Sequence, residues 1–339
     1  GPARPMIITR TPFRVSLFGG GTDYPPWFRR HGGAVLGTTI DKYCYISLRE
    51  LPPFFEHRHK IVYSKVETVR EVAEIQHPAV RAVMGEHPVP VGLEIHHDAD
   101  LPARSGLGSS SAFTVGLISA LRALQGRMSS AEYLAREAIR IEQEVIEENV
   151  GSQDQVWAAY GGTNVIEFRP DGSFAVTPVV MPPARRAELE SHLMLFFTGF
   201  SRIASEVAAK QIANFSARER QLHAMRAMVD EGLGILQGEA APIAEIGRLM
   251  HRGWMMKREL AEGVTTTAID EIYDAARGAG AVGGKLLGAG GGGFMAFLVE
   301  PARRAAVAEA LRGLVEVRFR IGSPGSRVVV YEPDGLGHG

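Results

Sequence analysis

Short runs rich in β-branched and aromatic residues, separated by Gly, Pro and Asp, dominate the first hundred residues of the chain. Such runs predict strands, because these side chains favour extended backbone while Gly, Pro and Asp favour the turns between strands. We expect strands at residues 6–9, 14–18, 34–40, 43–48, 60–63 and 91–97. Apolar residues then recur at helical spacing over 112–124 and 130–149, which predicts two helices, the second with Ser130 at its cap.

The second half of the chain shows a different order of elements. Alternation returns at 163–168 and 173–177, and the proline-rich stretch 178–183 that follows is typical of a domain boundary. Beyond it, the pattern predicts helices and strands in the order of a ferredoxin-like domain. Their expected positions are a strand at 192–198, helices within 202–260 and at 267–277, strands near 285 and at 294–299, a helix at 301–314, and strands at 315–321 and 327–331. We predict an α+β protein with one domain at 1–180 and another at 184–339.

The composition excludes several classes of protein. Of the 339 residues 45% are hydrophobic and the formal net charge is -1, so no positive charge excess favours nucleic acid or an anionic membrane. A single cysteine, Cys44, excludes an intrachain disulfide and fits a reducing compartment. No apolar run approaches the roughly 18 residues that span a bilayer, and residues 1–5, which resemble a cloning remnant, lack the hydrophobic core of a signal peptide. We expect a cytoplasmic protein whose partners are small molecules.

Glycine departs from its average share, with 39 glycines in 339 residues against a usual proportion of about 7%. The glycines gather in short clusters between apolar stretches, at 19–21, 32–33, 106–108, 161–162, 283–284 and 288–293. Clustered glycine indicates tight turns, or backbone that another group must approach closely. The clusters are therefore candidate ligand loops.

The segment 101–112, Leu-Pro-Ala-Arg-Ser-Gly-Leu-Gly-Ser-Ser-Ser-Ala, follows an expected strand and opens an expected helix. A turn on Gly106 and Gly108 would direct backbone N–H groups and the positive end of a helix at one spot, which favours an anion such as phosphate. The serines at 109–111 would add hydrogen bonds or a magnesium ligand, or would only cap the helix. The segment is not the P-loop of common ATPases, because no Lys-Ser or Lys-Thr pair follows at the required spacing.

A second glycine-rich segment, 288–293, matches the dinucleotide-binding pattern G-x-G-x-x-G letter for letter. That pattern binds a dinucleotide between a strand and a helix, whereas residues 294–299 are expected to form a buried strand. We interpret the segment as a hairpin loop, or as backbone that passes close to a phosphate or to the other domain.

The helix expected at 130–149 carries a carboxylate on its apolar face. Glu142 lies at the centre of a stripe of apolar residues at 135, 138, 139, 145 and 146. A carboxylate in such a place is unfavourable without a cationic partner, such as an arginine or a metal ion. Asp154 follows in the break Gly-Ser-Gln-Asp-Gln. Near a phosphate loop these carboxylates suggest a magnesium ligand and a general base, and a salt bridge with a helix cap is the structural alternative.

A third candidate segment lies near the start of the chain. Arg14 occupies an expected strand, and three glycines then precede Thr22 and Asp23. Such a turn can direct a hydroxyl and a carboxylate at the hydroxyl groups of a sugar, or it can satisfy both side chains locally. The histidines at 57, 59, 96 and 97 are interpreted as ordinary surface or core residues, because strand neighbours point to opposite faces and no carboxylate cluster accompanies them.

Together, these segments resemble the superfamily of galactokinase, homoserine kinase, mevalonate kinase and phosphomevalonate kinase, the GHMP kinases. Three motifs in the family's order carry the resemblance: Thr-Pro-Phe-Arg-Val-Ser-Leu-Phe-Gly-Gly-Gly-Thr-Asp-Tyr at 11–24, the loop at 102–112, and Lys-Leu-Leu-Gly-Ala-Gly-Gly-Gly-Gly-Phe at 285–294. The resemblance implies an N-terminal domain like domain 2 of ribosomal protein S5 and a ferredoxin-like C-terminal domain. It also implies that ATP and Mg²⁺ bind between the two domains.

The resemblance further implies roles for single residues. Asp154 matches the catalytic aspartate of the sugar kinases, with Arg14 beside it and beside the transferred phosphoryl group, while Glu142 and Ser110 would hold magnesium. The nucleotide would contact Pro102, Arg104, Ser105, Gly106, Leu107, Gly108, Ser109, Ser110 and Ser111. The sugar would contact Gly20, Gly21, Thr22, Asp23, Lys42 and Gly151.

Within the superfamily the chain most resembles the bacterial D-glycero-D-manno-heptose 7-phosphate 1-kinases, through residues 19–25, 39–42 and 281–290. Galactokinases carry Glu-His where this chain has Gly20 and Gly21, so the glycines remove a carboxylate and leave space that suits a larger, anionic substrate. The implied reaction is ATP-dependent phosphorylation of the anomeric hydroxyl of heptose 7-phosphate to heptose 1,7-bisphosphate. Such enzymes supply activated heptose for lipopolysaccharide, capsule or S-layer glycans.

Several points stay open at this stage. A fucokinase-type or other sugar 1-kinase is the alternative enzyme, and a non-catalytic sugar sensor on the same fold is the alternative from another class, although the presence of both Glu142 and Asp154 argues against a sensor. A phosphate on the substrate requires basic partners. The candidates near the expected sugar site are Arg29, Arg30, Lys42 and Arg202. The sequence leaves the anomer and the oligomeric state undecided, a homo-oligomer included.

Overall fold

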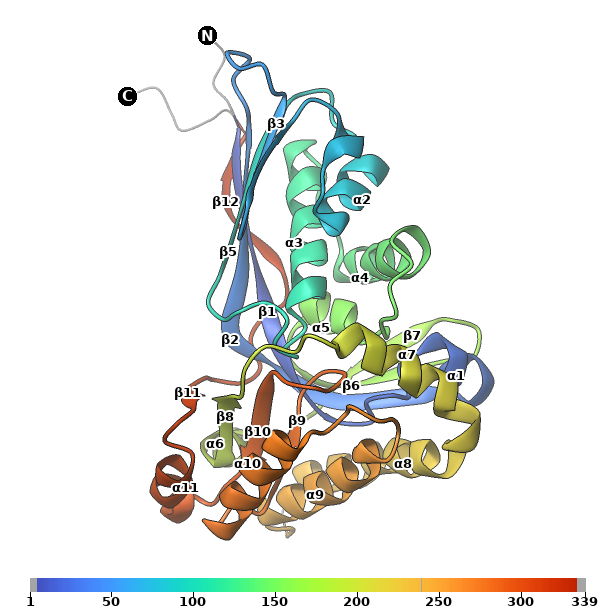
Figure 1. Ribbon diagram of the computed structural model, residues 1–339, viewed down its shortest axis with the longest axis vertical. Helices are drawn as coiled ribbons and strands as arrows, with labels where there is room; N and C mark the ends of the chain where they lie inside the picture. Colours follow the sequence, from blue (N-terminus) through green and yellow to red (C-terminus); the bar gives the residue numbers. More distant parts are fainter. Residues whose placement is uncertain (1–4, 239, 334–339) are drawn as a thin grey trace.

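The computed structural model describes residues 5–238 and 240–333, so most of the segment 1–5 lies outside the described residues. Its first domain is built on an eight-stranded sheet in the order β12-β1-β2-β5-β3-β4, with β6 paired to β2 and β7 paired to β6 (Figure 1). The strands are β1 (Met6–Phe18), β2 (Gly33–Glu50), β3 (His59–Val62), β4 (Val66–Val69), β5 (Leu93–Ala99), β6 (Thr163–Phe168), β7 (Phe174–Pro178) and β12 (Arg327–Glu332).

Two pairs of expected strands are each one continuous strand. Residues 6–9 and 14–18 both belong to β1, and residues 34–40 and 43–48 both belong to β2. Pro12, which lacks an N–H donor, lies between the first two expected strands. The sheet accommodates it through a shift of register between Pro12 and Arg14, where β1 pairs with β2.

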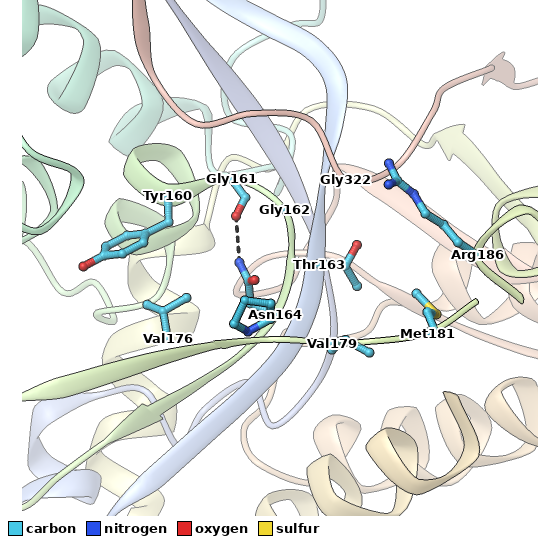
Figure 2. A pocket seen from close by; sticks show the side chains of 11 residues that line it. Tyr160, Gly161, Gly162, Thr163, Asn164, Val176, Val179, Met181, Arg186 and Gly322 are labelled. Carbon is cyan, nitrogen blue, oxygen red and sulfur yellow. Dashed lines mark hydrogen bonds between the residues drawn. The ribbon is translucent and has the colours of Figure 1, made fainter. Parts of the chain in front are cut away.

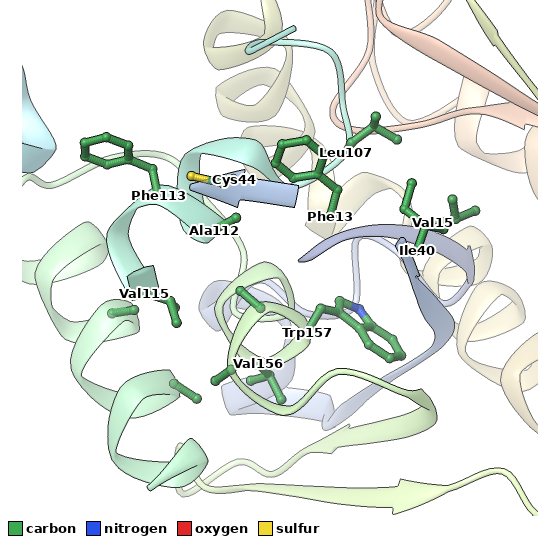
Figure 3. Packing of buried hydrophobic residues seen from close by; sticks show 14 of the residues in the cluster. Phe13, Val15, Ile40, Cys44, Leu107, Ala112, Phe113, Val115, Val156 and Trp157 are labelled. Atoms are coloured by element: carbon green, nitrogen blue, oxygen red, sulfur yellow. The ribbon is translucent and has the colours of Figure 1, made fainter. Parts of the chain in front are cut away.

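Helices cover one face of this sheet and bury its core. The long helix α3 (Ser109–Leu124) packs against β1 and β2, with α4 (Ala131–Arg140) and α5 (Asp154–Tyr160) beside it (Figure 1). Figure 3 shows Phe13, Val15, Ile40 and Trp157 packed between strands and helices, each at most 1% exposed. Two further helices of this domain, α1 (Pro25–His31) and α2 (Pro78–Glu86), were not expected from the sequence.

The second domain contains a four-stranded antiparallel sheet in the order β11-β8-β10-β9. Its strands are β8 (Leu193–Phe197), β9 (Gly283–Leu286), β10 (Phe294–Leu298) and β11 (Val315–Val317). Its helices are α6 (Pro183–His192), α7 (Ala204–Asn214), α8 (Glu219–Gln237), α9 (Ala244–Arg258), α10 (Thr267–Gly278) and α11 (Arg304–Ala310). The succession of strands and helices from β8 to β11 is the ferredoxin-like order that the sequence predicts. No described helix has the length and apolarity to cross a membrane.

The last strand differs from expectation. Residues 327–331 form a strand, β12, but β12 pairs with β1 in the first sheet, with Met6 opposite Glu332. The chain therefore crosses between the domains twice, at 178–183 and again at 317–327. The predicted second domain, 184–339, thus includes a strand that belongs to the first sheet.

The two domains meet where two glycine loops touch. A Cβ on Gly106 would lie 2.3 Å from the carbonyl oxygen of Leu287, and a Cβ on Gly288 would lie 2.7 Å from the Cα of Gly106. Both glycines have positive φ, +83° and +82°, which other residues rarely adopt. The loop at 288–293 thus joins β9 to β10 and lets backbone of the second domain approach the loop at 102–112.

This contact predicts a stability difference between two glycine substitutions. Gly106→Ala combines left-handed strain with a clash against backbone, whereas Gly126→Ala has similar strain (φ +73°) and nothing within 4 Å of the new Cβ. We expect Gly126→Ala to lower the free energy of unfolding by about 1 kcal/mol and Gly106→Ala to lower it by at least about twice as much. Denaturant unfolding of both variants measures this, and equal losses would contradict the close domain contact.

Candidate active site

A cleft of about 750 Å³ lies between the two domains. The first domain contributes Arg14, Tyr24, the loop at 101–110 and residues 148–151 with Asp154. The second contributes Ser201, Arg202, Ala204, Ser205, Ala208, Gly288 and Ala289. Residues of all three sequence motifs therefore line one cavity, although up to about 270 residues separate them along the chain.

The loop at 102–112 presents backbone rather than side-chain caps to this cleft. Helix α3 begins after Gly108, whose φ is +75°, and no side chain caps its first turn. The expected serine cap is therefore absent, and the N–H groups of the first turn are free to bind an anion. Of the nine residues predicted to bind the nucleotide, those that line the cleft are Arg104, Gly106, Gly108, Ser109 and Ser110.

Other residues of the loop are held by hydrogen bonds within the protein or are buried. The Ser105 hydroxyl donates to the carbonyl of Pro102 (2.6 Å), and the Ser105 carbonyl accepts from the N–H of Phe294 (2.8 Å) in the second domain. Leu107 is buried, and its carbonyl accepts from the N–H of Arg14 (3.0 Å). These contacts position the loop between β1 and the second domain.

Arg14 and Asp154 form an ion pair at the floor of the cleft. Nε of Arg14 donates to Oδ1 of Asp154 (2.7 Å), and Nη1 of Arg14 donates to the carbonyl of Gly106 (2.6 Å). Only 6% of the arginine side chain is exposed, against 30% of the aspartate side chain, so the carboxylate remains accessible from the cleft. The arginine thereby fixes the carboxylate relative to the anion-binding loop.

Glu142 is buried without a cationic partner. Helix α4 ends at Arg140 and continues as a π-helical turn, Ile141–Val145, so the helix expected to reach 149 stops earlier and places Glu142 in that turn. Its carboxylate accepts hydrogen bonds from the Ser111 hydroxyl (2.8 and 3.0 Å) and from Nε2 of Gln155 (2.7 Å). Burial raises the pKa of Glu142 to about 8. No ion pair of the described residues includes this carboxylate.

The surroundings of Glu142 have the chemistry of a magnesium site. Mg²⁺ prefers carboxylate, amide and hydroxyl oxygens. Oε1 of Gln155 is buried without a hydrogen-bond partner beside the Glu142 carboxylate, and a cation would compensate both groups. The structure places the Ser111 hydroxyl on Glu142, while Ser110, the serine expected to hold the metal, lines the cleft. The residues present therefore fit a magnesium ion.

Asp23 and Thr22 differ in their availability to a substrate. The Thr22 hydroxyl has local partners, the carbonyls of Gly19 (2.7 Å) and Ala34 (2.9 Å) and the N–H of Ala34 (3.1 Å), which is the local satisfaction that the sequence left open. The Asp23 carboxylate accepts a hydrogen bond from the N–H of Gly21 (3.0 Å). Burial, reinforced by the charge of Asp154, raises the pKa of Asp23 to about 6.

The two glycines predicted to contact the sugar differ in the space around them. A Cβ on Gly20 would meet no atom closer than 3.9 Å, so space is open there, whereas a Cβ on Gly21 would lie 3.2 Å from Leu222 of α8. Gly151 lines the cleft, but Lys42 is absent from the lining of each described cavity. The loss of the galactokinase side chains therefore leaves room at Gly20, and Leu222 fills the space at Gly21.

Several residues of the site were not expected from the sequence. His77, His97 and Phe113 line the far end of the cleft, where the Phe113 ring lies 4.7 Å from His77 and 4.9 Å from His97, between ring centroids. Burial lowers the pKa of both histidines, which favours neutral aromatic rings. Their contacts with Phe113 depend on tertiary packing, so no local pattern indicates them. Two buried lysines, Lys257 and Lys285, adjoin the cleft from the second domain.

A second cavity, of about 480 Å³, lies away from these groups (Figure 2). It is lined by residues of β6 and β7 together with Arg186 of α6 and Gly322, and it shares no residue with the cleft. Its polar side chains bind the protein itself: the Asn164 amide donates to the Gly161 carbonyl (2.7 Å), and Arg186 donates to the Ile321 carbonyl (2.7 Å). The cleft, not this cavity, therefore gathers the groups suited to chemistry.

Two family models match the chain in the order of its domains. Residues 68–162 match the N-terminal domain of GHMP kinases, and residues 239–316 match the C-terminal domain of GHMP kinases. The chain belongs to the GHMP kinase family, and its α+β fold is the fold of that family. This confirms the resemblance seen in the three sequence motifs.

Individual relatives cover nearly the whole chain. The D-glycero-alpha-D-manno-heptose 7-phosphate kinase of Campylobacter jejuni is 29% identical over 322 residues, which are 90% of this chain and 93% of that protein. A bifunctional fucokinase/GDP-fucose pyrophosphorylase of Arabidopsis thaliana is 26% identical over 87% of this chain and 30% of that protein. A crystal structure of a D-glycero-D-manno-heptose 1-phosphate kinase from Bacteroides thetaiotaomicron superposes with a TM-score of 0.76 at 26% identity, covering 95% of this chain and 98% of that one.

The burial of Glu142 predicts a pH-dependent loss of stability. Because its folded-state pKa is raised above the ordinary value of 4.5 to about 8, its contribution is fully present below about pH 4.5 and is lost as the pH rises toward 8. We expect metal-free wild type to lose at least about 1 kcal/mol relative to Glu142→Gln between pH 5 and 8. Denaturant unfolding across this range measures the difference. Glu144→Gln, at an exposed position of the same turn, is the control, and parallel pH profiles for wild type and Glu142→Gln would refute the prediction.

Proposed function

We propose that the protein transfers the terminal phosphoryl group of ATP to the anomeric hydroxyl of D-glycero-D-manno-heptose 7-phosphate. The products are heptose 1,7-bisphosphate and ADP. In the reaction the anomeric oxygen forms a bond to the γ-phosphorus, the bond from that phosphorus to the β,γ-bridging oxygen breaks, and the hydroxyl proton leaves through a base. The product would serve the synthesis of nucleotide-activated heptose for lipopolysaccharide, capsule or S-layer glycans.

The observation that carries this proposal is the ion pair at the cleft floor. The Asp154 carboxylate lines the cleft and lies 2.7 Å from Arg14, and Arg14 also donates to the Gly106 carbonyl of the loop with the free N–H groups. A base held beside an anion-binding loop can accept the proton of a hydroxyl that attacks a phosphoryl group. Arg14 holds the Asp154 carboxylate in position and lies where negative charge develops during transfer.

The lining of the cleft also suggests how the nucleotide is oriented. The triphosphate would lie along Gly106, Gly108 and Ser109, where the first turn of α3 offers its N–H groups. The adenine ring of the nucleotide would stack at the end formed by His77, His97 and Phe113, because neutral aromatic rings favour stacking with a flat ring. The acceptor sugar would occupy the opposite end, beside Tyr24, Gly151 and Asp154.

Magnesium would be held by Glu142 with help from the serines that open α3. When bound, such an ion neutralises phosphate charge and orients the phosphates for in-line transfer. Independent of activity, millimolar MgCl₂ should stabilise wild type at pH 8 against unfolding and should not stabilise Glu142→Gln. Equal stabilisation of both proteins would remove Glu142 from the metal site.

The choice of heptose phosphate rests on the relatives and on the open space at Gly20. Both the Campylobacter jejuni relative and the Bacteroides thetaiotaomicron structure carry names of heptose phosphate kinases. Fucokinases are also among the relatives, which makes L-fucose the main alternative substrate. A comparison of heptose 7-phosphate with heptose, mannose, fucose and galactose at equal concentration decides between them. Preference for an unphosphorylated sugar would refute the heptose phosphate assignment and leave the kinase reaction intact.

Removal of the base predicts a loss of turnover. Asp154→Asn keeps the size of the side chain but cannot accept the hydroxyl proton, so we expect kcat to fall at least about 100-fold with a smaller change in KM. ADP release in the presence of ATP, MgCl₂ and heptose 7-phosphate measures kcat, and the melting temperature checks folding. Asp274→Asn, at an exposed position of α10, is the matched control. Turnover within about threefold of wild type would exclude Asp154 as the base.

A further inference from the structure

Two lysines are buried side by side at the edge of the cleft. Lys257 lies in the last turn of α9 and Lys285 lies in β9, and their exposed fractions are 8% and 7%. Both line a small cavity of about 20 Å³ together with Gly19 and Gly20 of the first domain. Lysine is rarely buried without an anionic partner, because removal of an ammonium group from water is costly.

The cavity lacks acceptors for the donors around it. The ammonium group of Lys257 donates to the carbonyls of Leu286 and Gly288, whereas no hydrogen bond or ion pair of the described residues includes the ammonium group of Lys285. Trp254, which also lines the cavity, has a buried indole N–H without a hydrogen-bond partner. Unpaired buried donors are uncommon in folded proteins. Their convergence on one cavity is an arrangement that suits an anion.

The nearby charges do not pair with Lys285. Asp23 is the anionic group among those that act on it, and it is not within ion-pair distance, whereas Arg14 and Lys257 are cations. Burial, reinforced by the charges of Lys257 and Arg14, holds the pKa of Lys285 well below its ordinary value, and burial lowers the pKa of Lys257 to about 8. A dianionic group would compensate both lysines and favour their protonated forms.

We propose that Lys285, with Lys257 and the indole N–H of Trp254, binds the phosphate group at the far end of the sugar substrate. This inference rests on the proposed function. It assigns the phosphate to the second domain, on the side of Gly20, rather than to the basic residues considered from the sequence. Arg29 and Arg30 are exposed on α1 and Lys42 lines no described cavity, while Arg202 lines the cleft.

The position of the cavity suits the far end of a sugar whose anomeric hydroxyl lies at Asp154. Lys257 lines the cavity and donates to the carbonyl of Gly288, a residue of the cleft lining, so the two linings are in direct contact. Gly20 lines the cavity and leaves open space toward Gln153, which directly precedes Asp154. A sugar that spans from Asp154 past Gly20 would therefore bring its other end to Lys285.

The cavity must widen to admit a phosphate group. Its volume of about 20 Å³ holds roughly one water molecule. Three of its lining residues are methionines, Met225, Met228 and Met250, whose unbranched side chains change rotamer at little cost. Repacking of these side chains would open the site without a change in the backbone.

Equilibrium titrations without ATP test the proposal separately from turnover. Heptose and heptose 7-phosphate, and mannose and mannose 6-phosphate, are titrated by calorimetry into wild type, Lys285→Met, Trp254→Phe and Lys65→Met. Lys285→Met keeps the length of the side chain and removes the charge, and Lys65→Met makes the same change at an exposed position of the β3–β4 turn. We expect wild type and Lys65→Met to bind the phosphorylated sugar of at least one pair at least tenfold more tightly than its unphosphorylated partner.

In Lys285→Met that preference should fall below about threefold, and in Trp254→Phe it should fall by a smaller factor. A preference that Lys285→Met retains would overturn the proposal, and so would the absence of any preference in wild type. Phosphorylation assays on the same sugars report on the proposed function independently. Turnover of heptose 7-phosphate with a preference insensitive to Lys285 would refute this site alone, whereas phosphate-dependent binding without turnover would refute the proposed reaction alone.

Discussion

Several ionisable side chains are buried in this protein without an oppositely charged partner. Arg14, Asp23, Glu142, Lys257 and Lys285 are all buried, and among the ion pairs of the described residues only Arg14 has a partner, Asp154. Each unpaired charge is unfavourable in the isolated protein, as the raised pKa of Glu142 and the lowered pKa of Lys257 indicate. Under the function proposed above, nucleotide, metal and sugar phosphate would bring the opposite charges.

The sequence located the site where local pattern and chemistry coincide. Glu142 was recognisable because it interrupts an apolar stripe, and Asp154 because it follows in a glycine-containing break. Lys257 gave no such signal, since a lysine in the last turn of a helix is favourable in its own right. Lys285 did carry one, because it is the charged residue in the otherwise uncharged run Ala-Val-Gly-Gly-Lys-Leu-Leu at 281–287. The sequence around Thr22 does not tell whether its hydroxyl faces a ligand or, as in the structure, its own turn.

The sequence also predicts the order of elements in the fold, but not every pairing of strands. The order of strands and helices from β8 to β11 followed from periodicity, because each element is amphipathic or buried as a unit. The pairing of β12 with β1 did not follow from periodicity. Partners more than 300 residues apart along the chain are chosen by which sheet edge is free, not by local propensity. The continuous β1 was missed for a related reason: its neighbour β2 absorbs the missing donor of Pro12 by a shift of register, which only the paired strands reveal.

The two crossings between the domains lie close together in space. Ile321, in the second crossing, accepts a hydrogen bond from Arg186 and donates one to Glu190, and both partners lie on α6, which directly follows the first crossing. Gly322 binds the carbonyl of Thr39 in β2, so the same short segment is attached to both domains. The cavity in Figure 2 lies at this junction. The two crossings are therefore tied to each other as well as to the sheet, so this edge of the domain interface is fixed by hydrogen bonds that neither crossing could form alone.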